Sequence, residues 1–208
     1  VEKYISNFMD GMANGPRGAE GAANVGVIVA NPKNGEILAM ATDNPYDLNN
    51  PRDLTSYYSQ DEINGMDNDT MLKNLYGIWK NYCISDAFEP GSTVKPLTIG
   101  AALDADVVQP SDTFVCDGYQ MFGGTRIRCS IYPGAHGTET LSDLIKHSCN
   151  DGLMQIGALL GPEEFLKYQK IFNFGATTGI DLPGEATGIL HTEESLSSGS
   201  TELASASF

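Results

Sequence analysis

A serine and a lysine three residues apart form the most chemically suggestive pair in the sequence. Ser92 and Lys95 lie in the stretch Phe-Glu-Pro-Gly-Ser-Thr-Val-Lys-Pro, residues 88–96. Because proline and glycine end whatever precedes them, we expect a helix to begin at Ser92. Residues three apart on a helix share a face, and an amine beside a hydroxyl can turn that hydroxyl into a nucleophile. The alternative is a helix-capping serine with a solvated lysine.

The expected position at a helix start would assist this chemistry. The positive end of the helix favours a serine alkoxide and a developing oxyanion. Lys95 could act as the general base only if its pKa is lowered, either by burial or by a nearby positive charge.

A second polar motif follows further along the chain. Ser148-Cys149-Asn150 is the one Ser-x-Asn in the sequence and falls between two expected helices. A second hydroxyl can relay a proton to a leaving amine, and an amide can hold a peptide carbonyl. The alternative is that Ser148 and Asn150 only cap helices.

Three cysteines and a histidine form another possible constellation. Cys116, Cys129, His136 and Cys149 offer three thiols and an imidazole, which is the donor set of a structural zinc site. Their spacing is not that of a common zinc finger, so a Cys116–Cys129 disulfide and free thiols stay open. His147 could replace Cys149 as the fourth ligand, although an ordinary helix-end histidine is the simpler interpretation.

The elements that must position these residues are of mixed type. Helices and strands do not alternate in a βαβαβ rhythm, which favours an α+β arrangement with an antiparallel sheet and segregated helices. Cys83 is expected to be a buried apolar residue. The expected elements are a helix over 1–12, a small-residue connector over 18–23, strands over 25–30 and 36–42 joined by an Asn-Gly turn, a polar loop over 43–69, helices over 71–79 and 92–103, a hairpin over 114–129, helices over 141–145, 153–160 and 165–172, a turn-rich segment over 178–185 and a mobile tail over 195–200.

Composition limits the class of protein. The chain has 208 residues, 41% of them hydrophobic, and a formal net charge of -15, which argues against a nucleic-acid partner and against docking on an anionic membrane face. No apolar run is long enough to cross a bilayer. Because Val1 opens directly into a helical pattern, we expect an excised piece of a longer protein whose upstream part could hold a membrane anchor.

The two serine motifs in this order resemble the active-site serine penicillin-recognising enzymes. Residues 88–96 are similar to the acylation motif of class B penicillin-binding proteins, the transpeptidases of peptidoglycan. The hairpin over 25–42, the His-Gly dipeptide at 136–137, the Ser-x-Asn motif and the segment over 178–185 follow in family-like order. The resemblance implies an α/β penicillin-recognising fold whose central antiparallel sheet, flanked by helices, is incomplete in this chain, with residues 1–208 as one partial transpeptidase domain.

The resemblance also implies roles for the site residues. Ser92 would be acylated by the D-Ala-D-Ala end of a stem peptide or by a β-lactam, with its own N–H forming half of the oxyanion hole. Lys95 would be the general base, Ser148 would pass the proton to the leaving amine, and Asn150 would bind the substrate amide. An amine from a neighbouring stem would then resolve the acyl-enzyme.

The family's third motif, Lys-Thr-Gly or Lys-Ser-Gly, is absent from the sequence. It carries the substrate carboxylate site, so we expect the isolated fragment to acylate poorly or not at all. Some elongation-type members resemble this chain in a metal site, held here by Cys116, Cys129, His136 and Cys149. No cofactor is expected for catalysis, and zinc would be structural.

The resemblance places the protein on the extracytoplasmic face of a bacterial membrane, with other wall-synthesis or division proteins as possible partners. Three alternatives stay open at this point. They are a D,D-carboxypeptidase or β-lactamase, in which water resolves the acyl-enzyme; a β-lactam sensor domain, which acylates once and signals; and a catalytically silent scaffold.

Overall fold

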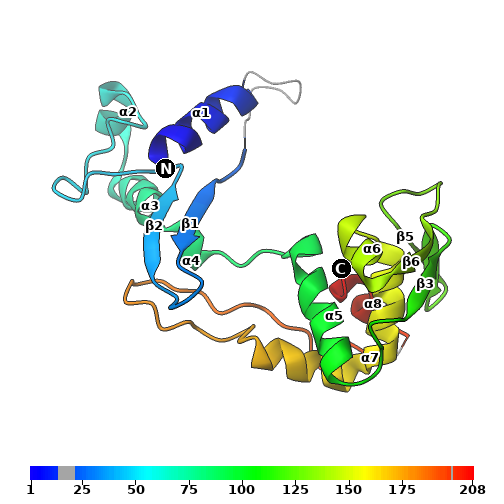
Figure 1. The fold of residues 1–208 in the computed structure, drawn as a ribbon. Coiled ribbons are helices and arrows are strands. Elements are labelled where there is room, and N and C mark those ends of the chain that lie inside the picture. Colours follow the sequence, from blue (N-terminus) through cyan, green and yellow to red (C-terminus); the bar gives the residue numbers. More distant parts are fainter. Residues whose placement is uncertain (14–21, 198) are drawn as a thin grey trace. The chain divides into compact units, whose positions relative to one another are not determined.

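The chain divides into two compact units. The structure, a computed structural model, describes residues 1–13, 22–197 and 199–208, so most of the expected connector over 18–23 and one residue of the expected tail lie outside it. Unit 1 comprises Val1–Ala87 and Gly179–Ala186, and unit 2 comprises Phe88–Thr178 and Thr187–Phe208. All eight candidate catalytic and metal-binding residues belong to unit 2, which is therefore the unit that matters for the site (Figure 1).

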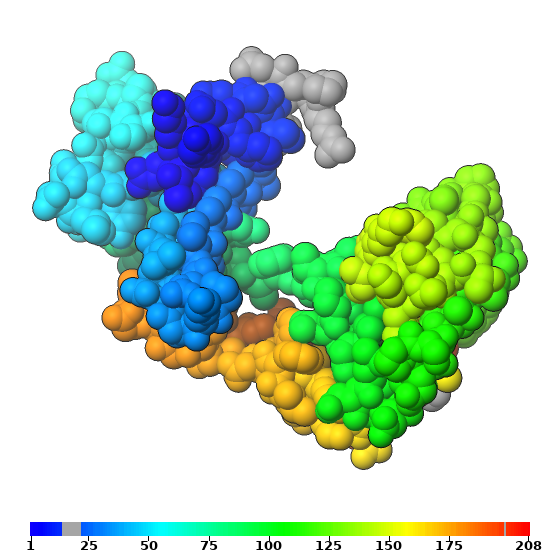
Figure 2. Space-filling model, viewed as in Figure 1, coloured from blue at the N-terminus to red at the C-terminus, as the bar shows by residue number. Residues whose placement is uncertain are grey.

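Unit 1 contains the expected helix and hairpin. Helix α1 (Glu2–Ala13) lies beside strand β2 (Ile37–Thr42) (Figure 2). Strand β2 pairs antiparallel with β1 (Gly26–Ala30). The register shifts between Val29 and Ala30, so the pair carries a bulge close to its turn. Gly35 closes that turn with a positive φ of 75°, a conformation that glycine adopts without steric cost.

The expected loop over 43–69 is wrong in its second half. Helix α2 (Gln60–Gly65) lies inside it, started by a capping box between Ser59 and Glu62. Helix α3 (Asn68–Trp79) begins three residues earlier than expected, because the Asp67 side chain accepts a hydrogen bond from the N–H of Thr70. The polar residues that suggested a loop are therefore residues that cap the N-termini of two helices.

A short helix that the sequence pattern did not indicate follows. Helix α4 (Tyr82–Ser85) is capped by Asn81 and packs against both strands of unit 1. Cys83 lies on it and is only partly buried, with its Sγ 3.6 Å from the carbonyl oxygen of Ala41. The expectation of a buried Cys83 is therefore wrong.

The helix that carries the candidate nucleophile starts later than expected. Gly91–Val94 form a 3₁₀ turn, and the α-helix proper, α5, runs over Lys95–Asp104. An α-helix beginning at Ser92 would need the N–H of residue 96 to donate to the Ser92 carbonyl, and Pro96 has no N–H. Ser92 is thus on a tight turn, and Lys95 begins the helix.

The expected hairpin over 114–129 is partly wrong. Its turn at Gly123-Gly124 is confirmed, and both glycines have positive φ, 53° and 81°. The two strands that this turn joins pair with each other, whereas residues 113–116 pair antiparallel with a strand that was not foreseen. The strands are β3 (Thr113–Cys116), β4 (Tyr119–Phe122), β5 (Thr125–Arg128) and β6 (Gly137–Thr140), in two sheets ordered β3-β6 and β4-β5.

Three helices complete unit 2. They are α6 (Leu141–Lys146), α7 (Asn150–Ile171) and α8 (Thr201–Ala206). The expected break at Gly161-Pro162 is confirmed, because Gly161 is non-helical with φ 74° and ψ 169°, and α7 is two helices across this kink. Of the helices in the described ranges, none is both long and apolar enough to cross a membrane.

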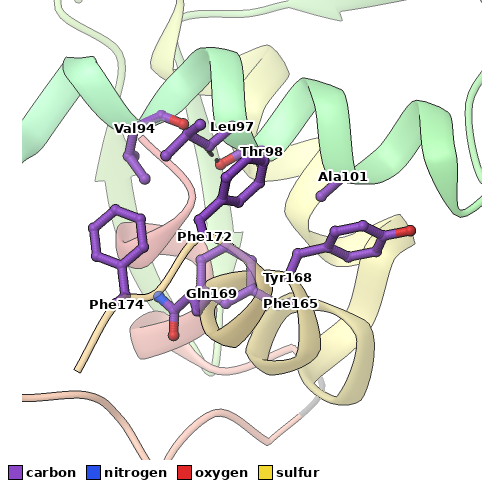
Figure 3. A pocket seen from close by; sticks show the side chains of 9 residues that line it. All are labelled: Val94, Leu97, Thr98, Ala101, Phe165, Tyr168, Gln169, Phe172 and Phe174. Carbon is purple, nitrogen blue, oxygen red and sulfur yellow. Dashed lines mark hydrogen bonds between the residues drawn. The ribbon is translucent and has the colours of Figure 1, made fainter. Parts of the chain in front are cut away.

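The core of unit 2 forms where α5 packs against α7. Leu144, Leu153 and Ile156 are fully buried in this cluster. A small pocket remains between α5 and the second half of α7, and none of the candidate catalytic residues lines it (Figure 3). Its lining is mostly apolar: Val94, Leu97, Thr98, Ala101, Phe165, Tyr168, Gln169, Phe172 and Phe174.

Replacing Gly152 should destabilise unit 2. A Cβ at this position of α7 would collide with the Leu144 side chain, which has no free space to move into. We expect Gly152→Ala to lower the free energy of unfolding by about 1–3 kcal/mol, measured by urea denaturation. Gly100→Ala on α5, where a Cβ meets nothing within 4 Å, is the control and should be neutral or stabilising. Equal effects of the two changes would contradict this packing.

Candidate active site

Four polar side chains from three segments meet in one hydrogen-bonded line. The Ser148 hydroxyl lies between the other two reactive groups, 3.0 Å from Ser92 Oγ and 2.9 Å from Lys95 Nζ. Lys95 Nζ also donates to Asn150 Oδ1 at 2.6 Å and to the carbonyl of Ser148 at 2.7 Å. The structure therefore brings all four predicted catalytic residues together, with Ser148 as the link through which Lys95 reaches Ser92.

Ser148 has an unusual backbone conformation. Its φ is 52°, in the left-handed region that costs a non-glycine residue about 1–2 kcal/mol. The conformation follows from how α6 ends: the Ser148 N–H donates to the Ile145 carbonyl and the Cys149 N–H donates to the Leu144 carbonyl. This is a Schellman ending with serine at the position usually held by glycine. The turn directs both the carbonyl and the hydroxyl of Ser148 to Lys95.

Lys95 is a buried amine. Its side chain is among the largest fully enclosed ones, at 2% exposure. Burial lowers the pKa of Lys95 below its ordinary value of 10.5, because desolvation disfavours the ammonium form. The ring of Phe208 lies 5.8 Å from Nζ, and the neighbouring Ser207 carbonyl accepts a hydrogen bond from Thr98 at 3.1 Å. Residues 207 and 208 therefore help to enclose the amine.

The cysteines and the histidine predicted as metal ligands also converge. One ligand atom from each of Cys116, Cys129, His136 and Cys149 lies within 4.8 Å of every other. His136 Nδ1 is 3.5 Å from the Cys116 sulfur and 3.9 Å from that of Cys129, which is 3.9 Å from the Cys149 sulfur. All four cysteines of the chain are free thiols in this structure. The four donors come from four segments: the end of β3, the residue after β5, the residue before β6 and the N-cap of α7.

This geometry fits a tetrahedral metal ion. With zinc–sulfur bonds near 2.3 Å, the sulfurs of a tetrahedral site lie roughly 3.8 Å apart and a ligating nitrogen roughly 3.6 Å from each sulfur. Burial raises the pKa of the Cys149 and Cys116 thiols. Burial also acts on Cys129, but backbone N–H groups around its sulfur outweigh it and lower its pKa. Of the three thiols, Cys129 is therefore the one whose surroundings lower the pKa.

Asp151 fastens the loop of Cys116 to the start of α7. Its carboxylate is completely buried and accepts hydrogen bonds from the N–H of Asp117 at 3.0 Å, from Gln120 at 2.7 Å and from Gln155 at 2.8 Å. Because Asp151 directly follows Asn150, these hydrogen bonds fix the position of the catalytic residues 148–150 relative to the loop that follows Cys116.

Sequence reasoning missed three residues of this site. Asp151 and Glu139 look like ordinary solvated carboxylates in the sequence, yet both are buried. Phe208 stands more than a hundred residues from Lys95 in the chain. The one available signal was proximity, since Asp151 adjoins the Ser-x-Asn motif and Glu139 follows the His-Gly dipeptide by two positions.

Comparison with known proteins gives a family match over most of the chain. Residues 25–206 match the penicillin binding protein transpeptidase domain family. Stage V sporulation protein D of Bacillus subtilis is 38% identical over 182 residues, which is 87% of this chain and 25% of that protein. The chain spans about a quarter of the length of this relative and of two further curated relatives.

Solved structures give the same fold. A peptidoglycan glycosyltransferase from Burkholderia ambifaria superposes with a TM-score of 0.69 at 22% identity, covering 99% of this chain and 52% of that one. A complex of penicillin-binding protein 2 and MreC from Helicobacter pylori matches with a TM-score of 0.63 at 24% identity, covering 79% and 29%. The expected mixed α/β fold is confirmed.

The lowered pKa of Lys95 predicts a stability that depends on pH. Between the folded pKa and the unfolded value near 10.5, the unfolded chain binds more protons, so the free energy of unfolding should rise with pH. At pH values below the folded pKa, Lys95 is protonated in both the folded and the unfolded state, and the cost of burying its charge lowers the free energy of unfolding in full. Lys95→Met should remove the rise, as measured by urea denaturation from neutral pH to 10.5.

The control is Lys170→Met, an exposed position on the same unit, which should keep the rise. An unchanged pH dependence in Lys95→Met would contradict the assignment of a lowered pKa to Lys95.

Proposed function

The chain belongs to the penicillin-binding protein transpeptidase domain family, and from this we propose that it cross-links peptidoglycan by D,D-transpeptidation through a serine acyl-enzyme. The observation that supports this most directly is the hydrogen-bonded line from Ser92 through Ser148 to Lys95 and Asn150. It joins a hydroxyl nucleophile to an amine whose pKa is lowered by burial, which is what general-base activation of serine requires.

Acylation begins with the removal of the Ser92 proton. Neutral Lys95 accepts it, directly or through the Ser148 hydroxyl, while Ser92 Oγ attacks the carbonyl of the penultimate D-Ala. The tetrahedral intermediate collapses to an ester, and the terminal D-Ala leaves as an amine that takes the proton through Ser148. Asn150 holds the substrate amide, and the Ser92 N–H donates to the oxyanion.

Resolution of the acyl-enzyme reverses these steps. An amine from a neighbouring stem attacks the ester carbonyl, loses its proton to the Lys95–Ser148 pair and releases the Ser92 hydroxyl. The product is a peptide cross-link. A β-lactam ring opens by the first step alone and leaves a stable ester, so β-lactams are proposed as inhibitors of the same serine.

A zinc ion is proposed for the cluster of Cys116, Cys129, His136 and Cys149. Distances between the donors match a closed tetrahedral site, and such sites are structural. Cys149 lies between two catalytic residues, so when bound the ion would cross-link four loops around the Ser148 turn. The bound ion would make that turn more rigid and would take no part in bond making.

The setting of the protein follows from the reaction. Peptidoglycan lies outside the bacterial membrane, so we place this domain on the extracytoplasmic face, anchored by an upstream segment. Its proposed ligands are stem peptides ending in D-Ala-D-Ala and β-lactams. Other wall-synthesis proteins are proposed as partners, which the complex of a related protein with MreC supports.

Covalent labelling tests the reaction. In the complete transpeptidase domain, a fluorescent penicillin should label the wild type in proportion 1:1, and Ser92→Ala should abolish labelling because the nucleophile is gone. Lys95→Arg should slow acylation about 100-fold or more, since a guanidinium cannot act as the base.

Ser205→Ala, an exposed hydroxyl on α8 of the same unit, is the matched control and should label at the wild-type rate. Retained labelling in Ser92→Ala would sink the proposal. If the labelled enzyme lost its label by hydrolysis as fast as it was acylated, a β-lactamase or carboxypeptidase would be favoured instead.

Metal analysis tests the zinc site. Purified protein should contain one zinc per chain, and thiol titration should find the three cluster cysteines protected until a chelator is added. Cys149→Ser should weaken zinc retention, because a hydroxyl is a poorer ligand than a thiolate. If the protein contained no zinc and two of its four thiols failed to react, a disulfide would be indicated instead. If all four thiols reacted without a chelator, both the zinc site and the disulfide would be excluded.

A further inference from the structure

The hairpin formed by β4 and β5 has two faces of different character. Tyr119 lies opposite Arg128 in the strand register, and Met121 lies opposite Arg126. Because side chains alternate along a strand, these four share one face of the hairpin, here called the arginine–tyrosine face. Gln120 points to the other face, the side on which the hairpin rests on α7.

Each arginine of this face lies over a tyrosine ring. The Cζ atom of Arg126 is 4.5 Å from the centre of the Tyr119 ring, and that of Arg128 is 4.8 Å from the centre of the Tyr132 ring. The two rings meet edge to face, with centroids 6.3 Å apart. An arginine that stacks on a ring keeps the N–H groups in its plane for other partners. The two guanidiniums are therefore positioned before any ligand arrives.

A close approach of two backbone segments brings the tyrosines together. A Cβ at Gly118 would collide with the carbonyl oxygen of Gly134, and Gly118 has a positive φ of 90°. Glycine meets both conditions, so the start of β4 can lie against the turn that carries Tyr132. Tyr119, the first residue of β4, thereby meets the Tyr132 ring.

The described part of the chain leaves both arginines without an acidic partner. No carboxylate oxygen of residues 1–13, 22–197 or 199–208 lies within 4.0 Å of Arg126 or Arg128. Yet the chain has 27 acidic residues against 12 basic ones. Both arginines are exposed, and Met121 beside them is 53% exposed. Arginine, tyrosine and methionine are enriched where protein surfaces bind partners, and the unpaired charge favours an anionic one.

The opposite face of the hairpin joins it to the acylation site. Gln120 donates to the Asp151 carboxylate at 2.7 Å, and Asp151 directly follows Asn150. The hairpin and Ser92 also belong to the same compact unit. The proposed substrate is a polymer whose uncross-linked stem peptides end in a carboxylate. The planar fork of a guanidinium matches a carboxylate, so this polymer is an anionic partner that the face suits.

We propose that the arginine–tyrosine face is a second binding site for peptidoglycan, separate from the acylation site, at which Arg126 and Arg128 bind carboxylates of uncross-linked stem peptides. The inference rests on the proposed function and extends it to a site that holds the polymer. A penicillin occupies the serine site alone and does not reach the hairpin. Removal of the two charges should therefore weaken capture of the polymer and leave acylation by penicillin intact.

The binding test uses the complete protein with Ser92→Ala, so that the polymer is bound and not processed. Affinity for purified uncross-linked peptidoglycan strands is measured by biolayer interferometry. We expect the double change Arg126→Gln and Arg128→Gln to weaken binding about 10-fold or more, since two charge-assisted hydrogen-bonding groups are lost. Arg52→Gln, at an exposed arginine of unit 1, is the matched control and should bind like the parent.

Two further measurements identify the ligand and check the fold. Strands whose carboxylates have been converted to amides with a carbodiimide should bind the parent as weakly as untreated strands bind the double variant. With Ser92 intact, a fluorescent penicillin should label the double variant at the wild-type rate, which also shows that unit 2 is folded. Phosphatidylglycerol vesicles serve as the competing anionic surface and should not distinguish the double variant from its parent.

Each outcome supports or overturns the second site. Unchanged strand binding in the double variant would overturn it while the proposed function stands. Equal binding of amidated and untreated strands would overturn carboxylate recognition. Loss of penicillin labelling together with strand binding would reduce the arginines to a structural role. Binding lost for vesicles and kept for strands would make the face a lipid site. A wild type that penicillin does not label would overturn the proposed function, which the strand measurement does not test.

Discussion

The contact on which the active site depends is the bridge from the Lys95 ammonium to the turn between α6 and α7. Three acceptors from that turn surround Nζ, two from Ser148 and one from Asn150. Because the amine is buried, each of these hydrogen bonds offsets part of the cost of removing a charge from water. The same burial lowers the pKa of Lys95 and so prepares the amine to act as a base, whereas the three hydrogen bonds favour the ammonium form and hold the turn to Lys95.

These hydrogen bonds can form only if the turn between α6 and α7 is held in position by the residues packed around it. Ser148 has a strained backbone, and two residues that follow it are held in place: Cys149 lies among the other thiols, and Asp151 accepts three hydrogen bonds. These contacts reach β3, β4 and the loop after β5, none of which carries a catalytic residue. The small sheets of unit 2 therefore act as a support for the turn, and rigid support is what keeps reacting groups aligned.

The errors in sequence reasoning have specific physical causes. A missing N–H at Pro96 moved the start of the α-helix from Ser92 to Lys95. Ser59 and Asp67 cap helices although the sequence predicts a loop there, because the same polar side chains favour both loops and helix starts. The pairing of residues 113–116 with 137–140 spans more than twenty residues, and no local pattern encodes which strand a given strand will meet.

The sequence by itself determined the chemistry that is available. It set the Ser92–Lys95 spacing, the Ser-x-Asn motif, the first hairpin and the break at Gly161, because these depend on neighbours within a few residues. It also supplied three thiols and an imidazole as possible metal ligands. Only the tertiary structure decided that Ser148 lies between Lys95 and Ser92, that four separate segments bring the ligand atoms within 4.8 Å of one another, and that Glu139 is buried between two histidines. Those facts come from long-range packing, which places residues far apart in the chain at distances that no local spacing can specify.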